Sequence, residues 1–334
     1  MVYKVSFIIL GICNILDFGV RVSPHKFDRE EMAMWLKLTL VHGIGPKRLL
    51  RLFSHFESIG GLFDASGEKL LRTGILTSGM IEGMGRLKSA SDENYLCVID
   101  SCAEKGILML PLIDERYPKR LLGTGSPPCT LFLWGDASLL DAPKTFAIVG
   151  SRVANEAAHK FAYSVAGKLG NAGFAIVSGG ASGIDTEAHK GALDSGARTM
   201  CVMGAGFFNF YPGENRGLFE TIREKGLLIS EHLPNFHGDR ISFLQRNRIT
   251  SGLSDGLLFC ASESLKSGTA TQVKTAHSQK IPIFCPDIEV GVSPYTGVRD
   301  AMARCGALPV RGADEIINAL NEGKTAMYAQ LQNH

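Results

Sequence analysis

A glycine-rich stretch at residues 178–183 has the composition of a loop that binds an anion. It reads Ser178, Gly179, Gly180, Ala181, Ser182, Gly183. An apolar run precedes it, and a helix is expected to begin at Ile184. Glycines let the backbone approach a phosphate closely, and the first N–H groups of a helix have no partner inside that helix. The stretch predicts a phosphate cradle, with a helix cap that holds no ligand as the alternative.

An earlier apolar run, at 146–150, ends at Gly150. Ser151 and Arg152 follow it directly and supply a hydroxyl and a guanidinium. Two apolar runs, at 146–150 and 174–178, with a helix between them predict a parallel β-α-β unit. In such a unit the loops after both strands lie at the same edge of the sheet, which is where ligands bind. We therefore expect Arg152 beside the glycine-rich loop, where its guanidinium suits a phosphate.

Two more segments carry groups that suit phosphates. They are Arg246, Asn247 and Arg248, and Lys266, Ser267, Gly268 and Thr269. Arginine forks pair with phosphates through two hydrogen bonds, and the second segment stands at another expected helix start. Glu231 ends an apolar run and is expected to orient an arginine or a ribose hydroxyl. We expect all these groups at one edge of the sheet.

Aromatic residues follow the apolar run at 199–203. Phe207, Phe210 and Tyr211 are the members of this cluster that could stack on nucleic-acid bases. Packing in the core or in a dimer interface is the competing interpretation.

A second glycine turn occurs much earlier in the chain. Gly43 and Gly45 flank Ile44 between two expected helices, at 28–41 and 49–56, and Lys47 follows closely. This is the pattern with which a helix-hairpin-helix offers backbone N–H groups to a nucleic-acid phosphate. A tight interhelical turn that needs glycine for its dihedral angles is the alternative.

The elements around these residues predict the fold class. After residue 145, apolar strands are expected near 146–150, 174–178, 199–203, 227–230, 256–260, 281–285 and 307–310, with helices between most of them. Continuous apolar strands indicate a mostly parallel sheet covered on both faces. We predict a doubly wound, Rossmann-like α/β domain at 106–324, preceded by a small all-α domain at 28–105 that is SAM- or helix-hairpin-helix-like. Residues 1–27 are expected to be an N-terminal extension, and residues 325–334 a tail.

Composition excludes several classes of protein. The chain has 334 residues and a net charge of +2, so any anion site must be local. Its 8 cysteines form no CxxC pair, which favours a reducing, cytoplasmic compartment with no disulfide framework and no zinc site. The apolar segment near the N-terminus is too short for a membrane span and lacks the flanks of a signal peptide. No catalytic triad is evident, and we expect no bound cofactor or metal.

The motifs together resemble the DNA-processing protein A family, DprA, also called Smf. The matching strings are Val149-Gly150-Ser151-Arg152, residues 178–185 with Ala188-His189, Tyr211-Pro212 with Glu214-Asn215, Ile229-Ser230-Glu231, Arg246-Asn247-Arg248 and Ser267-Gly268. They occur in the family's order across roughly residues 107 to 310. The helical region with Gly43 and Gly45 resembles the small domain that usually precedes them.

This resemblance implies a cytoplasmic protein that binds single-stranded DNA, forms a homodimer and loads the RecA recombinase during natural transformation. It implies no catalytic turnover and no association with membranes. The sequence departs from the family pattern at Ser182, where a basic residue is common, at Phe208, where an acid is usual, and near 260–263 and 286–287.

Two other functions fit parts of the pattern. The wider Rossmann-like superfamily includes proteins that bind or cleave free nucleotides, such as phosphoribohydrolases of the cytokinin type. In that case Glu231 or Glu263 would supply an acid, and Lys266-Ser267-Gly268-Thr269 would stand for their glycine-rich run. A third interpretation is an interaction module whose glycine loops only cap helices.

Overall fold

The structure is a computed structural model that describes residues 27–262, 268–287 and 296–323. The chain divides into two compact units, the first ending at Phe132 and the second beginning at Leu133. Lys266, Ser267, the extension at 1–26 and the tail at 325–334 lie outside the described residues. The predicted boundary after residue 105 stays a prediction.

The first unit begins with a helical module that the sequence specifies through its caps. Its helices are α2 (Arg29–Thr39), α3 (Pro46–Leu52), α4 (Ile59–Phe63), α5 (Gly67–Arg72), α6 (Ser78–Ser89) and α7 (Glu93–Glu104). Asp28 caps α2 in a reciprocal capping box with Glu31, and Ser58, Ser66 and Thr77 cap later helices with their hydroxyls. Such caps satisfy N–H groups that a helix leaves unpaired. Trp35 on α2 is fully buried and forms part of the core of this module. The strand β1 (Ile107–Pro111) and the short helix α8 (Lys119–Leu122) follow.

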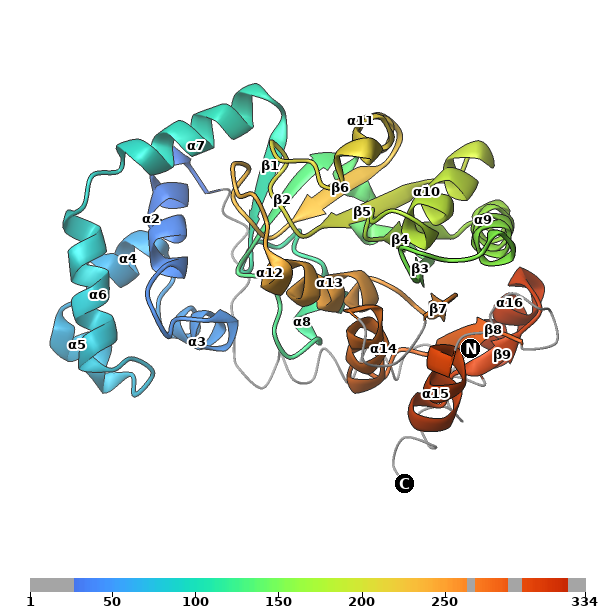
Figure 1. The fold of residues 1–334 in the computed structure, drawn as a ribbon. Helices are drawn as coiled ribbons and strands as arrows, with labels where there is room; N and C mark the ends of the chain where they lie inside the picture. The colour runs from blue at the N-terminus through green and yellow to red at the C-terminus, as the bar shows by residue number, and fades with distance from the viewer. Residues whose placement is uncertain (1–26, 263–267, 288–295, 324–334) are drawn as a thin grey trace. The chain divides into compact units, whose positions relative to one another are not determined.

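The sheet has nine strands in the order β1-β2-β6-β5-β4-β3-β7-β8-β9 (Figure 1). Its remaining strands are β2 (Thr130–Gly135), β3 (Thr145–Val149), β4 (Ala175–Ser178), β5 (Thr199–Met203), β6 (Leu227–Ser230), β7 (Leu257–Phe259), β8 (Ile283–Pro286) and β9 (Leu308–Val310). Every pairing from β6 to β9 is parallel. The strands expected after residue 145 and the Rossmann-like α/β class are confirmed.

Helices cover both faces of the β3–β4–β7–β8 region. On one face α9 (Glu156–Asn171), α10 (Ile184–Asp194) and α16 (Ala313–Asn321) pack on apolar side chains that include Ile148 and Ile176. On the other face α14 (Gly268–Ser278) and α15 (Thr296–Cys305) pack on side chains that include Val149 and Phe259. Successive residues of a strand point to opposite faces, so strands covered on both sides must be apolar throughout.

Three more helices follow β5 and β6 along the chain. They are α11 (Arg216–Lys225), α12 (Arg240–Gln245) and α13 (Asn247–Gly252). Among the described residues, no helix combines the length and the hydropathy that crossing a bilayer requires.

Candidate nucleic-acid interface

Glycine lets the loops after β3 and β4 pack directly against each other. A Cβ on Gly150 would lie 2.6 Å from the Cγ1 atom of Ile184, at the start of α10. Gly183 has a φ of +84°, and a Cβ on it would lie 2.5 Å from the carbonyl oxygen of Ser151. A side chain at either position would separate the loops. The predicted neighbourhood of residues 150–152 and 178–183 is therefore present.

Asp185, in the first turn of α10, closes part of the glycine-rich loop. Its Oδ2 atom accepts hydrogen bonds from the backbone N–H groups of Gly179 (3.2 Å) and Ala181 (3.4 Å). Asn215 donates from Nδ2 to the carbonyl oxygen of Gly180 at 3.0 Å and so fixes the other side of the loop. The N–H groups of Gly179 and Ala181 are therefore already hydrogen-bonded to Asp185, as the helix-cap alternative requires. A ligand at this loop would have to bind other groups.

Arg246 supplies such a group, because its guanidinium lies over Gly179. A Cβ added to Gly179 would be 1.3 Å from the Nη1 atom of Arg246, so only glycine leaves room for this side chain. Nη1 donates to the carbonyl oxygen of Val202 at 3.0 Å, while Nε is buried without a hydrogen-bond partner in the described structure. Burial lowers the pKa of Arg246, and the charge of Asp185 opposes that shift. Burial likewise raises the pKa of Asp185, against the attraction of Arg246.

A cavity of about 260 Å³ opens beside this guanidinium. Its lining consists of Arg152, Gly179, Ala181, Ser182, Tyr211, Pro212, Gly213, Glu214, Phe243 and Arg246. Arg152 is exposed, and neither arginine has an ion-pair partner among the described residues. The field of Arg152 also lowers the pKa of Arg246, although less than burial does, so the two cations act on the same space.

Of the three aromatic candidates, only Tyr211 borders the cavity. Tyr211 is 50% exposed, and its ring centroid lies 5.2 Å from that of Phe243. Phe207 is 2% exposed and packs on Trp134, which excludes a base from its ring faces. Phe210 packs on Phe219 at 5.2 Å and likewise lies outside the cavity lining. The stacking prediction is therefore wrong for Phe207. The structure instead places Phe210 in the packing against α11.

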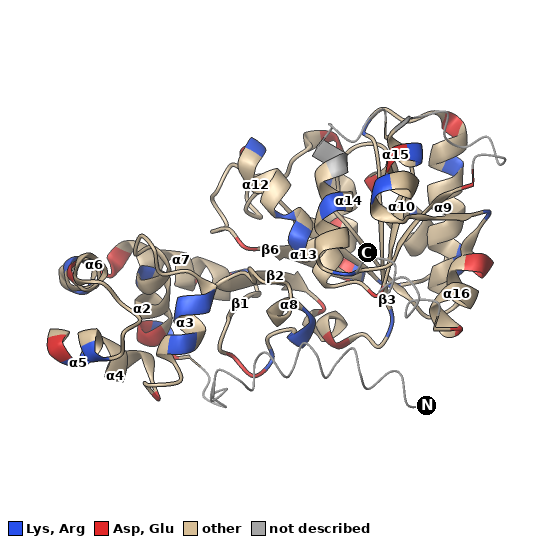
Figure 2. Cartoon of the chain, turned by 90° about the horizontal axis from the view of Figure 1, so that it is seen from below, with Lys and Arg blue, Asp and Glu red and all other residues tan. Residues whose placement is uncertain are grey.

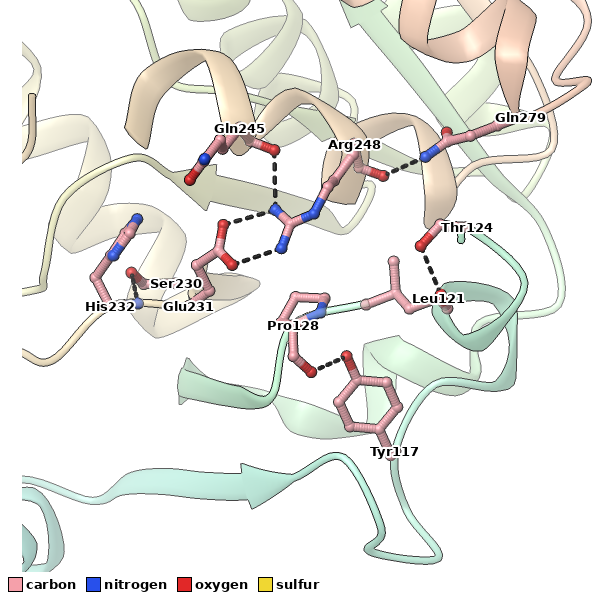
Figure 3. A network of polar contacts seen from close by, with 10 residues as sticks. All are labelled: Tyr117, Leu121, Thr124, Pro128, Ser230, Glu231, His232, Gln245, Arg248 and Gln279. Atoms are coloured by element: carbon pink, nitrogen blue, oxygen red, sulfur yellow. Dashed lines mark hydrogen bonds and ion pairs between the residues drawn. The ribbon is translucent and has the colours of Figure 1, made fainter. Parts of the chain in front are cut away.

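Arg248 also has a different role from the predicted phosphate contact. Its guanidinium donates to both carboxylate oxygens of Glu231, at 2.7 and 2.6 Å, and to the carbonyl oxygen of Gln245 (Figure 3). The pair is mostly buried, and Gln279 donates to the backbone oxygen of Arg248. Glu231 orients an arginine, as expected, but Arg248 does not line the cavity.

Several other predicted residues have structural roles. The buried Ser178 hydroxyl donates to the carbonyl oxygen of Ile148, and Ser151 Oγ donates to that of Val153. Asn247 is buried, and its carbonyl oxygen accepts from Gln272. The two serine hydroxyls are therefore used within the fold, and none of these three residues is among the described residues that line the cavity. Gly268 and Thr269 begin α14, and their contact with a phosphate stays a prediction.

The turn at Gly43 and Gly45 connects α2 and α3 as predicted. Gly43 has a φ of +87°, and its carbonyl oxygen accepts from Nη1 of Arg48 at 2.7 Å. Lys47 is exposed on α3. Contact of this turn with nucleic acid stays a prediction.

Residue-type arguments did not identify Glu214 and Phe243 as cavity residues. Phe243 on α12 lies three residues before Arg246, which caps the C-terminal end of that helix, so the helical period places both on one side. Glu214 lies in the short 3-10 helix η2 (Gly213–Asn215), and the sequence marks it only as part of the motif that begins at Tyr211. His189, on α10, is fully buried beside Thr199 and is not among the described residues that line the cavity; its burial lowers its pKa to about 3, which makes it a weak base.

Charge is otherwise spread over the chain. Lys and Arg appear on α3, α8, α12, α13 and α15 in Figure 2, with acidic residues between them. No group of three or more His, Cys, Asp or Glu side chains that could hold a metal ion occurs within the described ranges.

Comparison with known proteins assigns the family. The chain is 31% identical over 303 residues to Protein Smf of Synechocystis, covering 84% of this chain and 74% of that protein. The X-ray structure of DNA processing protein A from Streptococcus pneumoniae superposes with a TM-score of 0.71 at 26% identity, covering 88% of this chain and 98% of that one. A structure of the Helicobacter pylori protein, described for its single-stranded DNA binding mode, covers 65% of this chain and 96% of that one with a TM-score of 0.58 at 29% identity. Residues 108–321 match the family described as DNA recombination-mediator protein A, and the chain belongs to that family.

Proposed function

We propose that this protein binds single-stranded DNA at the cavity between the glycine-rich loop and residues 211–214, as a recombination mediator. The observation that carries the proposal is the pair of arginines, Arg152 and Arg246, that line one cavity, neither of them in a salt bridge with a residue that the structure describes. The Helicobacter pylori relative described for its single-stranded DNA binding supports the choice of ligand.

The energetics favour a phosphate at these arginines. Arg246 is buried, Asp185 is the carboxyl that attracts its charge, and its Nε has no hydrogen-bond partner among the described residues. A phosphate oxygen would supply a charge-assisted hydrogen bond there, and the exposed Arg152 can reach the same group. Tyr211 offers a half-exposed ring on which a base can stack.

Fluorescence anisotropy with a labelled dT oligomer tests the proposal. We expect Arg152→Ala to weaken binding about tenfold, the effect of one charge-assisted contact, and to reduce the slope of log K against log salt by about 0.7. Arg304→Ala is the matched control, because it removes an equal charge from an exposed site on α15. Equal losses in both variants would refute a local site.

The proposal extends to the partners that family membership implies. A mediator in this family would form a homodimer and load RecA onto the strand that it holds during natural transformation. Light scattering measures the mass of the assembly, and RecA ATPase activity on DNA coated with single-strand-binding protein measures loading. A monomeric mass or unchanged RecA activity would remove the corresponding part of the proposal.

The cavity is close in size to the pockets that hold small ligands, which supports a second candidate, a free nucleotide. Its volume of about 260 Å³ lies just below the usual range for ligand pockets, about 300–1,000 Å³. A thermal-shift series with mononucleotides separates the candidates, because a ligand that binds the folded state raises the melting temperature. A large shift with a mononucleotide and no affinity for oligomers would favour the nucleotide.

A further inference from the structure

The cavity contains a carboxylate that a pure phosphate site would not need. Among the described residues that line it, Glu214 is the acidic one. Its Oε1 atom accepts a hydrogen bond from the Ser182 hydroxyl at 2.6 Å, and that bond lowers the pKa of Glu214. No cation in the described part of the chain forms an ion pair with it, so the negative charge is held in place without being neutralised.

The two arginines and this carboxylate remain separate although they line one small space. Neither Arg152 nor Arg246 lies within ion-pair distance of Glu214. The cavity therefore has a cationic side and an anionic side, with the ring of Tyr211 also on its wall. A ligand that fits both sides must carry an anion and a hydrogen-bond donor.

Carboxylate chemistry restricts what can occupy the anionic side. An ionised carboxylate only accepts hydrogen bonds, and it repels phosphate. In a nucleotide the phosphate carries the negative charge, and base edges carry the N–H donors. Cytosine, adenine and guanine present an amino group, whereas thymine presents carbonyl oxygens and one imino N–H.

We infer that Glu214 is a specificity-determining residue that accepts a hydrogen bond from the amino group of a base stacked on Tyr211, while the arginines hold the phosphate. The inference rests on the proposed function and adds a base preference to it. Ser182 is the positioning residue, because its hydroxyl orients the carboxylate and leaves the second oxygen for the base.

Anisotropy with three oligomers of equal length tests the preference in the full chain. The first contains deoxycytidine and the second thymidine. The third contains the 2-pyrimidinone deoxynucleoside, which is deoxycytidine without its amino group. We expect the deoxycytidine oligomer to bind about fivefold more tightly than the other two, near the low end of the discrimination that one base contact provides.

Glu214→Gln should bring the three affinities to within about twofold of one another, because an amide no longer presents a purely accepting, charged edge. The variant keeps an oxygen for the Ser182 hydroxyl, so the loop is preserved. Glu220→Gln, which removes an equal charge from an exposed position on α11, should retain the full preference.

The outcomes separate the inference from the proposed function. Binding of the deoxycytidine and thymidine oligomers with equal affinity would overturn the inference alone, as would an undiminished preference in Glu214→Gln. Failure of the wild-type chain to bind any oligomer would overturn the proposed function and the inference with it.

Discussion

The two glycine turns of this chain have similar composition and different chemistry. The turn at 43–45 leads into α3, and Arg48 uses its guanidinium to close that turn by donating to Gly43. The loop at 178–183 leads into α10, and there an acid, Asp185, closes the backbone. Arg246 is thereby left facing a cavity.

The difference shows that glycine provides the space, whereas the positive charge of the proposed site comes from arginine. In the second loop two of the expected N–H donors are already occupied by Asp185, yet the site is still cationic because Arg152 and Arg246 reach it. A glycine-rich motif therefore predicts close packing more directly than it predicts a ligand.

Adding one methyl group to each turn should give the largest difference in DNA affinity between the two turns. Gly179→Ala places a Cβ on the guanidinium of Arg246, so we expect DNA affinity to fall more than tenfold and stability to fall by about 1–3 kcal/mol. Gly45→Ala meets no atom within 4 Å and should cost less than about 1 kcal/mol, from the weaker cap. Anisotropy and urea unfolding measure both variants. Similar losses of affinity would mean that the turns are equivalent.

The next test separates the two arginines around Asn247. Arg246→Lys keeps the charge but loses the fork, and we expect about tenfold weaker DNA binding. Arg248→Lys should leave DNA affinity within about twofold, while the loss of its paired bonds to Glu231 lowers stability by about 1–2 kcal/mol. If Arg248→Lys reduced affinity as much as Arg246→Lys, the site would have to extend to the Glu231 pair.

Lys47→Ala should have the smallest effect. Lys47 is exposed beside a turn whose backbone oxygen is already bound by Arg48, and we expect less than a twofold change in DNA affinity. The salt dependence of binding, compared with that of Arg152→Ala, is the measurement. A loss equal to that of Arg152→Ala would establish the first turn as a second phosphate contact.

Local patterns predicted the elements well. Apolar runs bounded by glycine located β3 to β9, because a strand covered on both faces needs apolar residues at every position. The same local logic brought Arg152 to the glycine-rich loop, since successive parallel strands end at one edge.

The errors concern residues whose environment depends on distant parts of the chain. Phe207 appeared available for stacking, but Trp134 covers it. Arg248 resembles Arg246 in sequence, but Glu231, 17 positions away, pairs with Arg248. Glu214 gave no signal of its own, because a glutamate is ordinary on a surface until it shares a cavity with two arginines.

Periodicity, glycine positions and motif order are properties of the chain, and they were sufficient to predict the parallel sheet, the tight loops and the family. Which polar atoms remain for a ligand depends on the packing of distant segments. Each donor or acceptor can be used by only a few partners, and packing assigns Asp185, Glu231 and Val202 as partners before any ligand arrives.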